Sequence, residues 1–99
     1  MSWHIGYIDE VADDFKKLDG SQKIRVRKAI KKTLQNPLPR SKGGVNLTNC
    51  LEIKLRGEGL RVIYKLICTE SEMLVVIIGA REDEEVYDEA SERITRYRL

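Results

Sequence analysis

The stretch CLEIKLRGEGLRVIYKLICTESEMLVVIIGA, residues 50–80, decides the fold. Residues 50–56 alternate between apolar and polar side chains, and residues 60–67 form a second β-type run after a Gly-Glu-Gly turn at 57–59. Residues 73–80 are apolar on both faces, which predicts the central strand of a sheet. Because the connections are short, these three strands are expected to form an antiparallel meander.

The N-terminal part predicts one strand and two helices. Residues 3–8 alternate and are typical of a short strand. Asp9 is expected to cap a helix that ends near Leu18, and Ser21 is expected to cap a second helix that ends at the Asn-Pro pair 36–37. The short turn between the helices predicts an antiparallel helical hairpin, and residues 37–48 predict a loop.

A last helix is expected from about Glu82, where Val86, Ala90 and Ile94 recur at helical spacing and acidic residues fill the first turn. The predicted order is therefore βααβββα. This order indicates an α+β fold, in which a small, mainly antiparallel sheet carries the helical hairpin on one face and is followed by a C-terminal helix. Residues 1–99 are expected to form a single domain.

The composition excludes several classes of protein. With 41% hydrophobic and 34% charged residues, the chain is too apolar for a disordered protein. Its longest apolar run has eight residues, whereas about 20 are needed to span a bilayer, and the N-terminus lacks a secretory signal, so a cytoplasmic protein without membrane contact is expected. Cys50 and Cys68 lack metal-site spacing and predict reduced thiols.

The charges are segregated, although the net charge is only +2. Residues 23–32 carry basic but no acidic side chains, and residues 82–92 carry acidic but no basic ones. Such a basic run is in most proteins a solvated helix face, and it can also steer an anionic partner.

A set of basic and aromatic residues is the candidate for chemistry. His4 is the sole histidine and is expected to be a partly exposed strand residue, so Ser-His-Asp and Cys-His sites are not favoured. One surface, opposite the helical hairpin, is expected to be bordered by Lys54, Arg61, Arg81 and Tyr87. Arginine and lysine bind phosphate and stabilise a pentacoordinate transition state, and tyrosine can stack on a base. The spacing alone leaves two interpretations open, a phosphodiester site and a set of solvated strand charges.

Three segments of the chain resemble the RelE toxins of bacterial toxin–antitoxin pairs. They are the pattern C-L-E-I-K-L-R-x-x-G-x-R-x-x-Y from residue 50, the G-x-R at 79–81 and the E-V-Y-x-E-A at 85–90. The resemblance covers essentially the whole chain and is most specific over residues 50–90. It implies a ribosome-dependent endoribonuclease that enters the A site and cuts mRNA by attack of a ribose 2′-OH on the adjacent phosphate. It implies no metal and no cofactor.

The resemblance also implies roles for individual positions. Lys54 would help to activate the 2′-OH or stabilise the transition state, and Arg61 would hold the scissile phosphate. Arg81 would stabilise charge and protonate the leaving oxygen, and Tyr87 would stack on a base. Contacts to RNA or the ribosome are expected from the basic residues Arg25, Lys28, Lys31, Lys32 and Arg56.

Glu52 departs from the family pattern, because RelE proper has a lysine two positions before its equivalent of Lys54. Two interpretations compete. Glu52 removes a phosphate contact and weakens electrostatic stabilisation, or it acts as a general base, as a glutamate does in YoeB-like relatives.

The partners implied by the resemblance are the 70S ribosome with mRNA and a cognate RelB-like antitoxin that wraps the toxin. In this family the antitoxin can displace the C-terminal helix, and operator DNA is bound only through the antitoxin. The sequence leaves two alternative functions open. One is a ParE-like gyrase inhibitor, and the other is a catalytically weak homologue that only binds an antitoxin.

Overall fold

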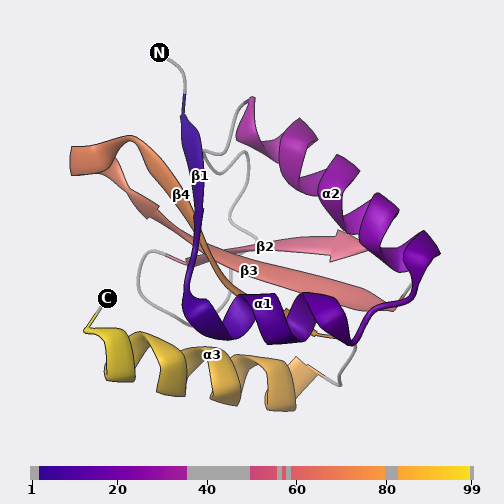
Figure 1. Ribbon diagram of the computed structural model, residues 1–99. Helices are drawn as coiled ribbons and strands as arrows, with labels where there is room; N and C mark the ends of the chain where they lie inside the picture. The colour runs from indigo at the N-terminus through magenta and orange to yellow at the C-terminus, as the bar shows by residue number, and fades with distance from the viewer. Residues whose placement is uncertain (1–2, 36–49, 56, 58, 80–82, 99) are drawn as a thin grey trace.

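The computed structural model describes residues 3–35, 50–55, 57, 59–79 and 83–98. The elements, in order along the chain, are β1 (His4–Tyr7), α1 (Asp9–Lys16), α2 (Gly20–Leu34), β2 (Cys50–Leu55), β3 (Leu60–Ile67), the short 3₁₀ helix η1 (Cys68–Glu70), β4 (Glu72–Gly79) and α3 (Asp83–Tyr97) (Figure 1). The predicted order βααβββα is confirmed, while the predicted loop at 37–48 lies outside the described residues. No helix in the described ranges is long and apolar enough to cross a membrane.

The four strands form one sheet in the order β1-β4-β3-β2. The pairs β2–β3 and β3–β4 are antiparallel, which confirms the predicted meander, and β1 pairs with β4 in parallel. The apolar strand β4 therefore lies inside the sheet, as its sequence predicts.

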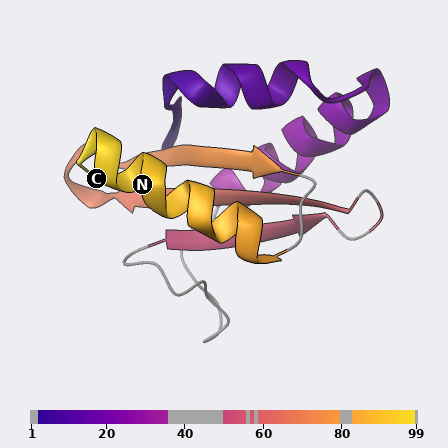
Figure 2. The same ribbon diagram turned by 90° about the horizontal axis from the view of Figure 1, so that it is seen from below.

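Both faces of the sheet are covered. Val62 and Ile63 are adjacent on β3 and point to opposite faces, yet both are fully buried. On one side α2 packs against β2, and α3 crosses the other side, so the sheet lies between α2 and α3 (Figures 1 and 2). Helix α1 does not share the face of α2: it packs along β4 at the edge of the sheet (Figure 2). Val26 and Ile30 of α2 and Val86 and Ala90 of α3 supply much of the buried helix surface.

The helix starts differ from the predicted caps by one or two residues. Asp19, not Ser21, caps α2: its Oδ1 accepts a hydrogen bond of 2.7 Å from the Gln22 amide, and its own amide donates to Gln22 Oε1 at 3.1 Å. This is a capping box, which satisfies two backbone donors reciprocally. In α1 the cap position is Ile8, and Asp9 is the first helical residue. Ile8 is fixed there because its amide donates to Val75 O on β4.

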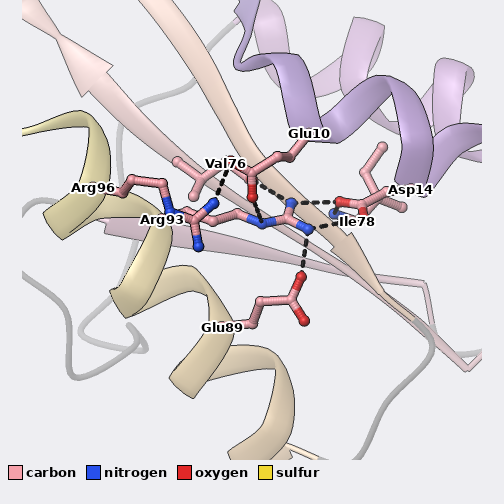
Figure 3. Close-up of polar contacts among 7 residues, drawn as sticks. All are labelled: Glu10, Asp14, Val76, Ile78, Glu89, Arg93 and Arg96. Atoms are coloured by element: carbon pink, nitrogen blue, oxygen red, sulfur yellow. Dashed lines mark hydrogen bonds and ion pairs between the residues drawn. The ribbon is translucent and has the colours of Figure 1, made fainter.

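The edge of β4 is closed by side chains beyond the end of β1. β1 pairs only with residues 72–75, and β4 then has an extra residue, Val76, opposite no residue of β3. Past this bulge, Val76 O accepts a hydrogen bond of 3.0 Å from Arg93 Nη1, and the Ile78 amide donates to Asp14 Oδ2 at 3.1 Å (Figure 3). Asp14 of α1 and Arg93 of α3 thus replace a neighbouring strand.

Asp14 and Arg93 also bind each other, and we name their surroundings the Arg93 cluster: Glu10, Asp14, Glu89, Arg93 and Arg96. Arg93 Nη1 and Nη2 lie 2.7 and 3.1 Å from Asp14 Oδ2 and Oδ1, and Nη2 also donates to Glu89 one turn earlier. Glu10 Oε2 lies 3.1 Å from Arg93 Nε, and Glu10 Oε1 accepts from Arg96 (Figure 3).

Burial alone would lower the pKa of Arg93, but the hydrogen bonds and charge of Asp14, together with Glu89 and Glu10, raise it above its usual value. The guanidinium is therefore held charged inside the protein, and its contacts join α1 and α3 around the edge of the sheet.

Candidate active site

The β2–β3 hairpin places three charged side chains on the face that α3 covers. Lys54 is the direct cross-strand partner of Arg61, and Glu52 is the partner of Ile63. Gly59 in the connecting turn has a φ of 65°, which glycine adopts without steric cost. Residues two apart on a strand share a face, so Glu52, Lys54 and Arg61 all face the same side. The predicted proximity of Lys54 and Arg61 is confirmed.

Helix α3 brings Tyr87 to this group. Its neighbour Val86 is almost completely buried against the sheet, and Ala90 is fully buried one turn later, so the register of the helix is fixed. Tyr87 Oη donates a hydrogen bond of 2.7 Å to Glu52 Oε2. The site is therefore built where the start of α3 meets the hairpin.

Arg61 and Tyr87 converge on one atom. Arg61 Nη1 lies 2.8 Å from Glu52 Oε2, the same oxygen that accepts from Tyr87. The Glu52 side chain is 9% exposed and that of Arg61 23%, so the carboxylate lies deeper than the guanidinium. We name Glu52, Arg61 and Tyr87 the Glu52 cluster.

The chemistry available at this cluster is electrostatic. One guanidinium nitrogen of Arg61 and the phenol of Tyr87 donate to one carboxylate oxygen, and the exposed Lys54 adds a positive charge on the same face. His4 lies on β1, which is separated from β2 by two other strands, so the sole imidazole of the chain stands at the opposite edge of the sheet. Such an arrangement can bind an anionic group and stabilise developing negative charge.

Several predicted positions lie outside the described residues. Arg81 and Arg56 are among them, as are the side chains of Glu82–Glu85, so their proposed roles stay predictions.

The basic face of α2 is a separate surface. Arg25, Lys28, Lys31 and Lys32 are all exposed, and α2 lies on the other side of the sheet from α3 (Figure 2). Arg27 and Lys23 of the same helix lie over the ring of Phe15, 4.9 and 5.9 Å from its centroid, in a cation–π arrangement. The structure thus brings together Glu52, Lys54, Arg61 and Tyr87, and it places the predicted contacts of α2 elsewhere.

The sequence interpretation missed Asp14 and Arg93. A signal was present in both helices: Asp14 is three residues after the buried Val11, and Arg93 three after the buried Ala90, so each charge occupies an apolar stripe. A charged side chain in such a stripe needs a partner, and the two residues carry opposite signs.

Metal-binding side chains do not gather in the part of the chain that the structure describes: no group of three His, Cys, Asp or Glu residues there could hold an ion. Cys50 is buried with a free thiol, as predicted, and burial raises the pKa of that thiol although Lys65 opposes the effect. The side chain of Cys68 is outside the described set.

Known proteins resemble the chain over almost its whole length. No protein-family model matches it. An Escherichia coli protein named as a RelE-like toxin is 32% identical over 94 residues, which cover 95% of this chain and 99% of the relative. The mRNA interferase toxin RelE of Escherichia coli K12 is 28% identical over 94 residues, with the same coverage.

Solved structures agree with these relatives. A double arginine-to-alanine variant of E. coli toxin RelE in the free state has a TM-score of 0.83 at 26% identity and covers 95% of this chain and 99% of its own. The same variant in complex with a peptide of the antitoxin RelB has a TM-score of 0.76 at 26% identity, with 91% and 95% covered. From its sequence relatives and its fold, the chain belongs to the RelE family of toxins.

Proposed function

We propose that this chain is an endoribonuclease that enters the ribosomal A site and cuts mRNA there, with residues 1–99 as one toxin domain. The observation that carries the proposal is the convergence of Arg61 and Tyr87 on one anionic oxygen, with Lys54 on the same face. The name of the E. coli relative, an mRNA interferase toxin, supports the same activity.

The reaction proposed is attack of a ribose 2′-OH on the adjacent phosphate, which forms the O2′–P bond and breaks the P–O5′ bond. Lys54 assists loss of the 2′ proton or stabilises the charge of the transition state. Arg61 holds the scissile phosphate through its guanidinium fork. Tyr87 stacks on a base, and Arg81 supplies charge and the proton that the 5′ oxygen takes up. This division of roles requires neither a histidine nor a metal ion.

The basic face of α2 is proposed to contact ribosomal RNA. Arg25, Lys28, Lys31 and Lys32 are exposed there, and Arg56 is assigned to the same task from the sequence. Because this face and the Glu52 cluster lie on different sides of the sheet, one surface can dock on the ribosome while the other meets the message.

A RelB-like antitoxin is the proposed inhibitor. Solved structures of E. coli RelE with a RelB peptide and of a RelBE complex from the same organism support this class of partner. Binding of operator DNA is assigned to the antitoxin.

The geometry also favours a second candidate, a homologue with weak catalysis that mainly binds an antitoxin. The observation behind it is that Glu52 contacts both Arg61 and Tyr87, two of the groups that the reaction would use.

A translating extract distinguishes these candidates. The purified protein is added, and the 5′ ends of the message are mapped by primer extension. We expect cuts within A-site codons that disappear with Lys54→Ala and persist with Lys17→Ala, a matched control on the exposed end of α1. Intact message with retained antitoxin binding would support the weak homologue. DNA breaks linked to gyrase would instead indicate a ParE-like inhibitor.

A further inference from the structure

The Glu52 cluster has the geometry of an occupied anion site. Two donors from different elements, the Arg61 guanidinium of β3 and the Tyr87 hydroxyl of α3, meet at a single carboxylate oxygen. Arginine binds carboxylate and phosphate oxygens with the same fork of N–H groups. A phosphate oxygen at the position of Glu52 Oε2 could therefore accept the same two hydrogen bonds, from Arg61 and from Tyr87.

We propose that Glu52 is an internal competitor of the RNA phosphate: its carboxylate fills the site formed by Arg61 and Tyr87, and RNA must displace it. The ligand is a phosphodiester of single-stranded RNA. This inference rests on the proposed function, because it takes this face as the RNA-binding face.

Charge explains why displacement is required. The Glu52 side chain is 9% exposed, so little water surrounds its carboxylate and screens its charge. A phosphate at Arg61 would lie beside this negative charge, and two anions that share one pair of donors repel each other. The carboxylate must therefore leave when the phosphate enters.

The same contacts give Glu52 a positioning role in the RNA-free protein. Glu52 and Arg61 are on neighbouring strands, while Tyr87 is 35 residues away from Glu52 on α3. One carboxylate holds both donors toward the same point, so the site is preformed before RNA arrives. Glu52 thus orders the donors at the cost of RNA affinity, and this is the trade-off that the test measures.

The test is the affinity of the isolated protein for a short 2′-O-methyl RNA, which has phosphodiesters but no free 2′-OH and cannot be cut. Glu52→Gln keeps a hydrogen-bond acceptor of nearly the same shape and removes the charge. We expect this variant to bind the oligonucleotide about tenfold tighter than the unchanged protein, since one like charge beside the phosphate is lost. The gain should disappear when Arg61→Ala is added.

Glu72→Gln is the matched control. Glu72 lies on β4, pairs with Ile67, and is on the same face of the sheet as Glu52 but at a distance from Arg61. This variant loses the same charge and should bind RNA as the unchanged protein does. An equal gain in both variants would overturn the proposal, because a general change in net charge would then explain it.

Two further results would overturn the proposal. One is an unchanged or weaker RNA affinity of Glu52→Gln, which would leave Glu52 a structural role alone. The other is measured on the unchanged protein: the NMR signal of the Glu52 carboxylate carbon should shift when the oligonucleotide saturates the site, and a constant signal contradicts displacement.

Cleavage on ribosomes is measured separately. Tight RNA binding by Glu52→Gln without cleavage by any variant would overturn the proposed nuclease activity and support the competitor role. Cleavage by the unchanged protein, together with an unaltered RNA affinity of Glu52→Gln, would support the nuclease activity and overturn the competitor role.

Discussion

Helix α3 contributes side chains to two arginine–carboxylate clusters, Arg93 to one and Tyr87 to the other, and the clusters differ in the groups whose hydrogen bonds they satisfy. In the Arg93 cluster the central pair is buried: the side chain of Arg93 is 5% exposed and that of Asp14 9%. These two side chains also complete the backbone hydrogen bonds of Val76 and Ile78. In the Glu52 cluster Arg61 is 23% exposed, and the contacts described for Glu52 join side chains only.

The difference separates a structural pair from a replaceable one. Removing Asp14 would take from Arg93 its main ion-pair partner and leave the Ile78 amide without its acceptor, and removing Arg93 would leave the Asp14 charge without its ion-pair partner and Val76 O without its donor. An external anion can take the place of the carboxylate in the Glu52 cluster, because Arg61 is partly exposed and no backbone group depends on Glu52 among the contacts described. One helix is thus anchored near its C-terminal end and presents Tyr87 near its N-terminal end.

The largest expected effect is a loss of stability when the buried pair of the Arg93 cluster is disrupted. Asp14→Ala leaves the Arg93 charge short of its main partner and the Ile78 amide without its acceptor, so the free energy of unfolding should fall by about 3–5 kcal/mol. Urea denaturation followed by circular dichroism measures this. Arg96→Ala is the control, because Arg96 is 57% exposed and its solvent-screened ion pair with Glu10 should contribute much less than the buried pair.

A double variant tests whether the edge of β4 depends on the side chains of Asp14 and Arg93. Buried ion pairs can often be replaced by apolar residues without loss of stability. Here Asp14→Leu combined with Arg93→Met should stay destabilised, because Val76 O and Ile78 N–H lose their partners at about 1–3 kcal/mol each. Stability equal to that of the unchanged protein would show that the edge of β4 does not need these side chains.

The next effect concerns Tyr87 in the replaceable cluster. Tyr87→Ala removes the ring, so RNA cleavage on the ribosome should weaken by about 1–3 kcal/mol, the value of one base stack. Tyr87→Phe keeps the ring and loses the hydrogen bond to Glu52, so its loss should be smaller. Equal losses in the two variants would indicate that the hydroxyl, and not the stack, carries the role of Tyr87.

A smaller effect is expected on α2. Reversing the charge of Lys28 and Lys31 should lower ribosome affinity and reduce the dependence of binding on salt, because contacts to RNA phosphates release counterions. The control is the double variant Lys16→Glu, Lys17→Glu, which makes the same change of charge at the exposed C-terminal end of α1. If both double variants behave alike, the basic run is an ordinary solvated face.

The smallest effect is a pH dependence at the margin of the Arg93 cluster. The hydrogen bond from Arg96 lowers the pKa of Glu10, with smaller contributions from Tyr97 and Arg93. The folded protein therefore binds this proton less readily than the unfolded chain, so the stabilisation is present above the usual glutamate pKa and is lost as the pH falls through the lowered value. Glu10→Gln should flatten this acid dependence in urea unfolding, and an unchanged slope would contradict the assignment.

The sequence was sufficient for the elements and for half of the site. Alternation and the Gly-Glu-Gly turn set the register that places Lys54 opposite Arg61, and the helix after β4 returns Tyr87 to the same face. The Asp19 cap was also within reach, because Gln22 three residues later completes a capping box that Ser21 lacks.

Other features depend on contacts between distant segments. Asp14 and Arg93 are 79 residues apart, and no local pattern states that α1 and α3 meet at the edge of β4. Local pattern likewise gives the face on which Glu52 lies, but not the direction of its carboxylate. Both clusters therefore required the packed structure.

The most direct test of the account is mRNA cleavage on purified, programmed ribosomes by Arg61→Ala, measured beside its thermal unfolding. We expect cleavage to fall by about 100-fold or more while the unfolding temperature stays close to that of the unchanged protein, because Arg61 binds an anion and does not anchor the fold. Full cleavage by a folded Arg61→Ala protein would contradict the central claim that the Glu52 cluster is the RNA-cleaving site.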